Sequence, residues 1–246
     1  MQALEPRYRA DLTVSEVTRA LRALSSAYVE RRGTLAGGAA LDSAGKRAAF
    51  ALVFGPLHFL VIRDIVRRLD AGRDMPPLLV DLGCGTGVAG AAWALEASPP
   101  PRLLGVDRHP WAVREAGWTW RTLGLRGRAG QAEASLARWG ARAPAVVAGY
   151  VVNELPDRAR HALLERLRGV AAAGGRVLIV EPIARRAAPW WSEWAAAFES
   201  AGGRADEWTV TPDLPERVRV FSEAAGLNHR LVKARSLYLA AAPRQP

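Results

Sequence analysis

The 246-residue chain has little cysteine, little lysine and no long apolar run. Its one cysteine, Cys84, excludes an intrachain disulfide framework and any multi-cysteine zinc or iron–sulfur site within this chain. The four histidines are scattered without metal-ligand spacing, so no metal site is expected. Charged residues such as Glu5 and Arg7 stand where a signal peptide needs an apolar stretch, and we expect no such peptide. The single thiol fits a reducing compartment, and we expect a cytoplasmic location.

The most apolar run, residues 48–62, is too short to span a membrane. A spanning helix needs roughly 20 apolar residues, and Pro56 and His58 interrupt this run. We therefore expect a pair of buried helices in this region and no membrane partner.

The positive charge of the chain is arginine-based and dispersed. The formal net charge is +10, and Lys46 and Lys233 are the only lysines among 34 basic residues. An arginine bias with heavy alanine use is typical of a GC-rich genome as much as of phosphate binding. No stretch is a dense basic run, which favours a solvated surface over a nucleic-acid-binding stripe. RNA or a ribosomal subunit stays open as a partner.

The chain divides into a helical part, residues 1–75, and an α/β part, residues 76–246. The sequence predicts helices over residues 13–30, 44–54, 57–69, 110–123, 156–172, 189–201 and 215–225, and one from the glycine loop to about residue 97. Short apolar runs predict strands over residues 78–81, 103–107, 145–149 and 176–181, with a final extended stretch over 229–241. Strands alternating with helices predict a doubly wound, mostly parallel sheet with helices on both faces. The N-terminal helices are expected to form a cap over the sheet.

The strongest motif is the sequence D-L-G-C-G-T-G at residues 81–87. A predicted strand ends in Asp81, and alternating glycines lead into a helix. Such glycines remove side chains, so that a ligand can lie against the backbone, and a helix start offers free N–H groups. Asp107 ends the next strand, where in a doubly wound sheet it points at the crevice and can accept both hydroxyls of a ribose. The motif therefore predicts a ligand that carries a ribose.

The same glycines allow a second interpretation. Residues 85–90 match the G-x-G-x-x-G pattern of dinucleotide-binding proteins, and Asp107 lies at a tolerable distance from them. This match begins two residues late, inside the helix entry, but a nicotinamide or flavin enzyme stays open as an alternative. A glycine turn without a ligand is a further alternative, although alternating glycines cost conformational order.

From residue 76 to about residue 241 the chain resembles the class I S-adenosylmethionine-dependent methyltransferases. The D-x-G-x-G-x-G loop followed by an acid after the second strand is the most specific feature of that superfamily. V-A-G-Y-V-V-N-E-L-P at residues 147–156 resembles the motif of its fourth strand, and G-G-R-V-L-I-V-E-P at residues 174–182 that of its fifth. The resemblance implies a Rossmann-like fold with a seven-stranded sheet, S-adenosylmethionine as cofactor, and transfer of its methyl group to an acceptor.

The resemblance also implies roles for individual residues. Gly83, Gly85 and Gly87 would lie under the methionine part of the cofactor. Asp81 would orient its amino group, directly or through water, and Asp107 would hold its ribose. The cofactor-binding residues implied in full are Asp81, Gly83, Cys84, Gly85, Thr86, Gly87, Asp107, Arg108 beside the adenine, Gln131 and Ala132 near the adenine amino group, Gly149 and Tyr150.

Tyr150, Asn153 and Glu154 follow the fourth strand and are the candidate catalytic residues; in the fold that the resemblance implies, Tyr150 and Asn153 would face the transferring methyl group. Alternatively, Asn153 caps the following helix, and Glu154 is either a general base or a first-turn acid stabilised by the helix N-terminus. The sequence N-E-L-P at residues 153–156 replaces the N-P-P-Y motif of many nucleic-acid amino-methyltransferases, which argues against that chemistry. Glu181 either borders the substrate or ends its strand in solvent.

Two narrower resemblances point to different acceptors. Three segments are similar to the Rsm-type mitochondrial small-ribosomal-subunit methyltransferase-like family, whose C-terminal cysteine cluster this chain lacks: S-A-G-K-R at residues 43–47, Y-V-V-N-E-L-P at 150–156 and E-P at 181–182. E-L-P-D at residues 154–157 is similar to small-molecule O-methyltransferases. A small-molecule O or N acceptor is favoured, and an rRNA or small-subunit methyltransferase, or a non-catalytic assembly factor, stays open.

The tail contains Trp190, Trp191 and Trp194, which either pack in the core or form an aromatic wall for a flat substrate. Arg185 and Arg186 either meet an anion or lie in a solvated turn.

Overall fold

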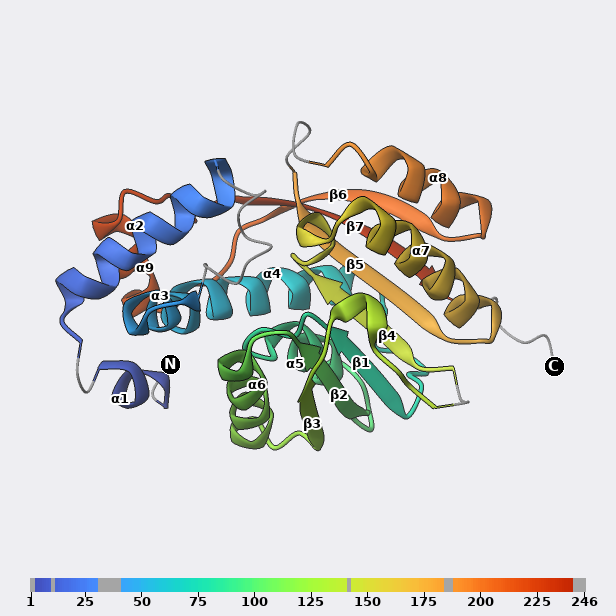
Figure 1. Cartoon of the computed structure of the whole chain (residues 1–246), viewed down its shortest axis with the longest axis horizontal. Helices are drawn as coiled ribbons and strands as arrows, with labels where there is room; N and C mark the ends of the chain where they lie inside the picture. The colour runs from blue at the N-terminus through green and yellow to red at the C-terminus, as the bar shows by residue number, and fades with distance from the viewer. Residues whose placement is uncertain (1–2, 10–11, 31–40, 141–142, 184–187, 241–246) are drawn as a thin grey trace. The chain divides into compact units, whose positions relative to one another are not determined.

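The computed structural model describes residues 3–9, 12–30, 41–140, 143–183 and 188–240. The chain forms two compact units, Met1–Val61 with Thr209–Val232, and Ile62–Trp208 with Lys233–Pro246. The first unit is helical, and the second contains most of the sheet (Figure 1). The first unit thus includes a segment from near the C-terminus. The predicted division into residues 1–75 and 76–246, with the first as a cap, stays a prediction.

The helical unit contains α1 (Leu4–Arg9), α2 (Val14–Glu30), α3 (Ala44–Ala49), the π-helix η3 (Phe50–Phe54), the start of α4 (Gly55–Arg68) and α9 (Glu216–Ala224). α2 begins with a capping box, because the Glu16 backbone N–H donates to Thr13 Oγ1 and the Thr13 backbone N–H donates to the Glu16 carboxylate. Val17, Leu21 and Leu24 of α2 are fully buried. Their helical spacing explains why this helix was predictable from sequence.

The predicted break between residues 54 and 57 was wrong, because Ala44–Arg68 is one continuous helical segment. At the π-helix, the Gly55 backbone N–H donates to the Phe50 carbonyl, five residues earlier. We attribute the continuity to this wider turn, which makes room for Pro56, a residue that lacks an N–H and clashes in a regular helix. By length and composition the segment could cross a membrane, yet more than half of its most apolar part is buried within the protein, as in a core helix.

The sheet has seven strands in the order β3-β2-β1-β4-β5-β7-β6. They are β1 (Leu78–Leu82), β2 (Arg102–Asp107), β3 (Gly127–Gln131), β4 (Ala145–Gly149), β5 (Arg176–Pro182), β6 (Arg204–Val210) and β7 (Val232–Ala240). The first five strands are parallel, and β7 is antiparallel to β5. The predicted doubly wound, mostly parallel seven-stranded sheet is confirmed. The strand predictions missed β3 and β6, which lie at the two edges of the sheet.

Helices cover both faces of the sheet (Figure 1). α5 (Val88–Ala94) and α6 (Pro110–Thr122) pack on one face, and α7 (Asp157–Ala172) and α8 (Trp191–Ser200) on the other. Trp194 of α8 is fully buried in the core. Its ring centre lies 5.0 Å from that of Trp190 in an edge-on contact. The tryptophan-rich segment therefore serves core packing, the first of its two interpretations. Arg185 and Arg186 lie outside the described residues.

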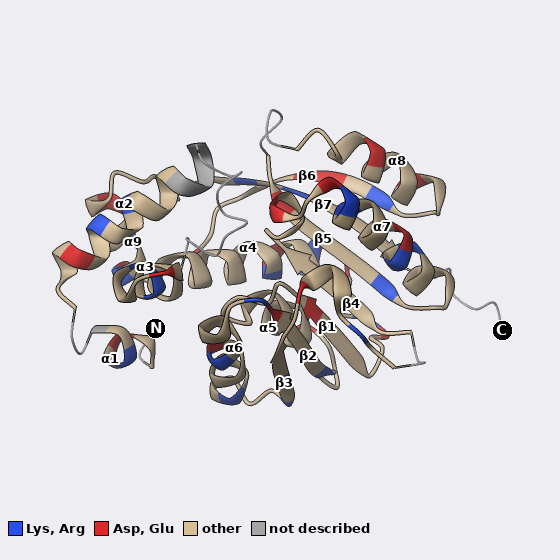
Figure 2. Cartoon of the chain, in the orientation of Figure 1, with Lys and Arg blue, Asp and Glu red and all other residues tan. Residues whose placement is uncertain are grey.

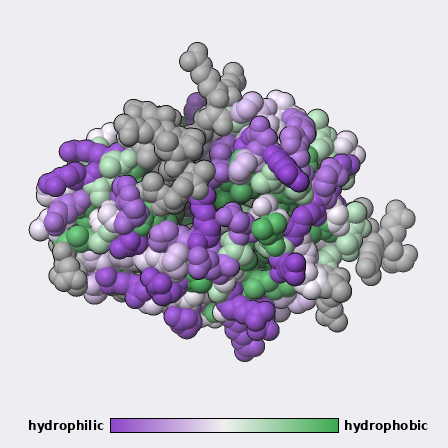
Figure 3. All heavy atoms as spheres, in the orientation of Figure 1, coloured by the Kyte–Doolittle hydropathy of each residue, from purple (hydrophilic) through white to green (hydrophobic). Residues whose placement is uncertain are grey.

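Charged residues of both signs are interspersed along the described elements, as α7 shows (Figure 2). The face drawn in Figure 3 is mainly polar, with apolar residues in small areas. The large apolar side chains exposed in the described part of the chain are Val14, Leu123, Leu136, Val220 and Leu231. In the described residues the charge thus keeps the dispersed pattern expected from the sequence.

Two glycines provide a matched test of this packing. A Cβ at Gly90 of α5 would lie 2.8 Å from Asp81 Oδ2 and 3.1 Å from Leu103 Cδ2, whereas one at Gly169 of α7 would meet nothing within 4 Å. We expect Gly90→Ala to lower the free energy of unfolding by about 1–3 kcal/mol through overpacking. Gly169→Ala should raise it by up to about 1 kcal/mol through helix propensity. Urea denaturation of both variants measures this, and equal effects would contradict the packing described.

Candidate functional site

The glycine loop after β1 has a conformation that requires glycine. The φ angles are +62° at Gly83, +51° at Gly85 and +78° at Gly87, all in the left-handed region. A Cβ at Gly83 would lie 2.3 Å from Val151 Cγ2, and one at Gly87 would lie 2.8 Å from Ala116 Cα. Backbone conformation and close packing therefore explain why residues 83 and 87 are glycines. This reason is different from the predicted one, which was that glycines let a ligand lie against the backbone.

Asp107 at the end of β2 is turned toward the glycine loop. Its Oδ2 accepts the Gly85 backbone N–H at 2.9 Å, and its Oδ1 accepts the His109 backbone N–H at 2.8 Å. The side chain is half-buried. Each carboxylate oxygen has a further lone pair, so Asp107 can accept two hydroxyl groups while it holds both backbone N–H groups.

The predicted adenine-side residues lie next to Asp107. In the β2–β3 pairing, Asp107 is opposite Gln131. The Gln131 side-chain amide donates to the Arg108 carbonyl at 3.0 Å, and the Ala132 backbone N–H donates to the Asp107 carbonyl at 3.1 Å. The ends of β2 and β3 thus form one connected edge beside the glycine loop.

Two polar atoms beside the loop are buried without a hydrogen-bond partner among the described residues. Asp81 is fully buried, and its Oδ2 accepts the Gly90 backbone N–H at 2.8 Å, whereas its Oδ1 has no partner. Thr86 Oγ1 is the second such atom. Burial raises the pKa of Asp81 to about 8, and the charge of Asp107 adds to the rise. Buried polar atoms without partners are unusual, and a polar ligand or a water commonly satisfies them.

Cys84 and Gly149 contribute packing at the carboxyl ends of the central strands β1 and β4. Cys84 is buried, and a Cβ at Gly105 would lie 3.0 Å from its Sγ, so the thiol packs against β2. Burial raises the pKa of this thiol. A Cβ at Gly149 would lie 3.0 Å from Ile62 Cδ1, a tight contact that would require the Ile62 side chain to shift.

Glu181 of β5 organises the segment after β4. Its side chain is buried, with Oε1 accepting the Val152 backbone N–H at 2.8 Å and Oε2 accepting the Asn153 side-chain amide at 2.6 Å. Trp190 Nε1 donates to Asn153 Oδ1 at 2.9 Å. Burial raises the pKa of Glu181 to about 8, which its backbone hydrogen bonds and Arg235 oppose. Glu181 therefore does not end its strand in solvent, and the sequence did not reveal this role.

The structure corrects two alternatives for the candidate catalytic residues. Asn153 does not cap α7, whose N-cap is Pro156 with no side-chain hydrogen bond. Glu154 ends the separate 3₁₀ helix η5 (Val152–Glu154) and is not a first-turn acid of α7. Its Oε2 lies 3.2 Å from Arg108 Nη2, and burial raises its pKa to about 7, with Asp107 adding to the rise and Arg108 opposing it.

Tyr150 has an unusual backbone conformation for a residue other than glycine. Its φ is +61°, and its backbone N–H donates to the Val180 carbonyl at 2.8 Å. Burial raises the pKa of its hydroxyl. Such strained positions cluster at functional sites, which agrees with its predicted place in the site but does not assign it a role.

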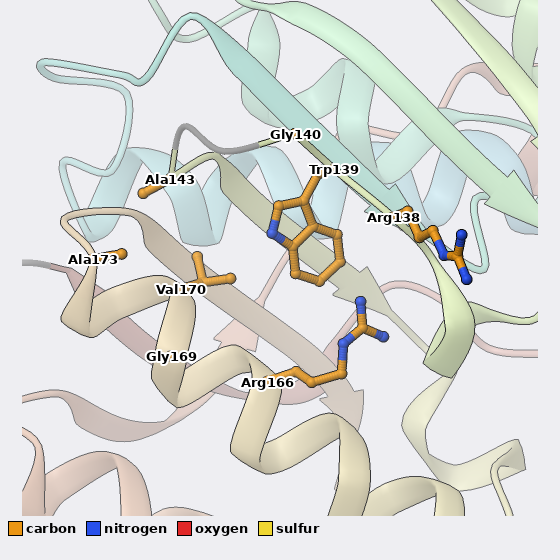
Figure 4. Close-up of a pocket in the computed structure, with 8 residues that line it drawn as sticks. All are labelled: Arg138, Trp139, Gly140, Ala143, Arg166, Gly169, Val170 and Ala173. Atoms are coloured by element: carbon orange, nitrogen blue, oxygen red, sulfur yellow. The ribbon is translucent and has the colours of Figure 1, made fainter.

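A separate hollow of about 450 Å³ lies between α7 and the segment before β4 (Figure 4). The indole of Trp139 points toward α7, and the Arg166 guanidinium lies 4.6 Å from its ring centre. Because Ala143 precedes β4, this hollow is at the amino end of that strand. It is therefore distinct from the residues gathered at the carboxyl ends of β1, β2 and β4.

Comparison with known proteins identifies the fold. A structure titled as an S-adenosylmethionine-dependent methyltransferase from Aquifex aeolicus superposes with a TM-score of 0.52 and 14% identity, covering 76% of this chain and 92% of that one. The plantazolicin methyltransferase BpumL, in complex with a monoazolic analogue and S-adenosylhomocysteine (SAH), gives 0.51 and 10%, covering 93% and 98%. The chain therefore has the fold of the class I S-adenosylmethionine-dependent methyltransferases.

The fold alone does not define the reaction. The [4+2]-cyclase SpnF has a similar structure, with a TM-score of 0.51 and 16% identity over 74% of this chain and 82% of its own. No protein-family model and no curated protein sequence matches the chain. The chemistry must therefore be argued from the site.

The Glu181–Asn153–Trp190 network predicts a rescue by exchange of groups. In Glu181→Gln, the new side-chain N–H₂ faces the Asn153 N–H₂, so two donors oppose each other. A flip of the Asn153 amide relieves this clash, but it then places the Asn153 N–H₂ against the Trp190 N–H, which is also a donor. The double variant Glu181→Gln with Asn153→Asp restores one donor to each acceptor. We expect the single variant to lose about 1–3 kcal/mol of stability and the double variant to regain most of it, measured by urea denaturation. Additive losses in the double variant would refute the network.

The buried Asp81 predicts a pH-dependent stability. Its pKa is raised in the folded protein, so between about pH 4 and pH 8 the unfolded chain gives up this proton while the folded chain keeps it. Stability from this group therefore falls as the pH rises through that range. Asp81→Asn lacks the effect, and we expect its free energy of unfolding, relative to the unaltered protein, to increase from pH 4 to pH 8 by at least about 1.4 kcal/mol. A constant difference across this range would contradict the burial of an unpaired carboxyl oxygen.

Proposed function

We propose that the protein is an S-adenosylmethionine-dependent methyltransferase. The observation that carries this proposal is the Asp107 carboxylate, which faces the glycine loop and accepts the Gly85 N–H at the carboxyl ends of adjacent strands. In a class I methyltransferase fold, this is the place where a nucleoside cofactor binds. A nicotinamide or flavin is not favoured, because the G-x-G-x-x-G match begins two residues after the first glycine of the loop, and solved structures that share the fold include S-adenosylmethionine-dependent methyltransferases.

The residues present fit this cofactor. Asp107 would accept the ribose hydroxyls, and Arg108, Gln131 and Ala132 would border the adenine. The unpartnered Asp81 Oδ1 and Thr86 Oγ1 are polar groups suited to its amino-acid part. When bound, S-adenosylmethionine supplies an activated methyl group for in-line displacement.

The contribution of the protein to such a reaction is mainly alignment. Holding an acceptor in line with the methyl group can supply up to about 7–11 kcal/mol of a barrier. The Asn153 amide is engaged by Glu181 and Trp190, which supports a positioning role for it. A hydroxyl acceptor also needs a base, and the assignments of Glu154 and Tyr150 to catalysis stay predictions.

For the acceptor we favour a small molecule with an O or N nucleophile. The dispersed charge supports this choice, and rRNA or a ribosomal small subunit is the alternative. Incubation of the protein with methyl-labelled S-adenosylmethionine and a cell extract, followed by separation of metabolites from RNA and ribosomes, decides between them. We expect label in the metabolites. Label in RNA alone would contradict a small-molecule acceptor and support rRNA.

Calorimetric titration with SAH tests the proposed function. We expect the unaltered protein to bind SAH and Asp107→Asn to weaken the affinity by about 10- to 100-fold, because charge-assisted hydrogen bonds to the ribose are lost. Asp206→Asn on the edge strand β6 is the matched control and should bind as the unaltered protein does. Circular dichroism verifies that Asp107→Asn is folded. Absence of SAH binding by the unaltered protein, or equal binding by Asp107→Asn, would refute the proposal.

A further inference from the structure

An ion pair crosses the carboxyl end of the central strand β1. Arg108 follows β2 and Glu154 follows β4, and β1 lies between these two strands in the sheet. Arg108 Nη2 and Glu154 Oε2 are 3.2 Å apart. Since the glycine loop starts at the end of β1, the pair extends across the place where that loop begins.

Both partners of the pair are held by other groups. The Arg108 carbonyl accepts the Gln131 side-chain amide, which fixes the backbone next to Asp107. The backbone of η5 is fixed by Glu181, which accepts the N–H of Val152 two residues before Glu154. The two side chains span between these fixed backbones, so the contact can open by rotation of the side chains alone.

The pair is shielded from solvent more than an ordinary surface pair. The exposed fraction is 32% for the Arg108 side chain and 24% for that of Glu154. Partial burial reduces the screening of the contact by water, but it also raises the pKa of Glu154 to about 7, so the pair is fully charged only above neutral pH. Asp107, the proposed ribose acceptor, lies close enough to Glu154 to raise the pKa of its carboxyl group. Arg108 is the residue next to Asp107 in the chain, so the ion pair lies beside the proposed ribose acceptor.

We propose that the Arg108–Glu154 ion pair is a clasp across the cofactor crevice, which has to open before a nucleoside ligand reaches Asp107. This inference rests on the proposed function. It assigns Glu154 to control of cofactor entry, a role distinct from the predicted general base. It requires that the ligand-free protein is held closed by this contact and that opening limits the rate of association.

Stopped-flow measurement of SAH association tests the clasp. We expect Glu154→Gln and Arg108→Gln each to raise the association rate constant at least threefold. The double variant should give no further increase, since both substitutions break the same contact. Glu165→Gln is the matched control, because it breaks a surface ion pair with Arg168 on α7 at 3.1 Å, and it should leave the rate unchanged.

The outcomes separate the clasp from the proposed function. An unchanged rate in Glu154→Gln, or independent and multiplying effects of the two single substitutions, would overturn the clasp while SAH binding by the unaltered protein upheld the cofactor. No SAH binding by the unaltered protein would overturn both. Urea denaturation of the same variants shows whether a change in rate comes from loss of stability, in which case the clasp is also overturned.

Discussion

Acidic side chains near the carboxyl ends of the parallel strands bind backbone N–H groups in the segments that follow β1 and β4. Asp81 of β1 accepts the N–H of Gly90, Asp107 of β2 accepts that of Gly85, and Glu181 of β5 accepts that of Val152. These contacts fix the backbone of the glycine loop and of the segment after β4. The positions of the candidate site residues depend on this fixed backbone.

Burial of these acids disfavours their charged forms and so costs folding free energy. Burial raises the pKa of Asp81 and of Glu181 to about 8, because a charge is disfavoured away from water. Glu181 is compensated by several donors and by Arg235, whereas one oxygen of Asp81 has no hydrogen-bond partner in the part of the chain that the structure describes. A fold optimised for stability alone would pair that oxygen. Buried polar groups without partners call for an explanation, and the proposed cofactor would supply a partner beside the glycine loop.

Much of the fold was predictable because the strongest local patterns lie in its centre. The apolar runs of β1, β2, β4 and β5 and the D-L-G-C-G-T-G motif identified the parallel sheet and its loop. The edge strand β3, G-R-A-G-Q, is mostly exposed and pairs through its backbone, so it has no apolar alternation to detect. Pro56 predicted a break between two helices. The π-helix that ends at Phe54 lets the helix continue through this position, and the sequence pattern did not reveal that π-helix. The partners of Glu181 and Glu154 were also hidden, since they lie 28 and 46 residues away in sequence.

The central claim is that the Asp107 carboxylate binds the ribose of a nucleoside cofactor beside the glycine loop. A crystal structure of the protein with SAH measures this directly. The account predicts both ribose hydroxyls within hydrogen-bond distance of Asp107, with the Gly85 N–H contact preserved. SAH bound away from the ends of β1 and β2, or a ribose that makes no contact with Asp107, would contradict it.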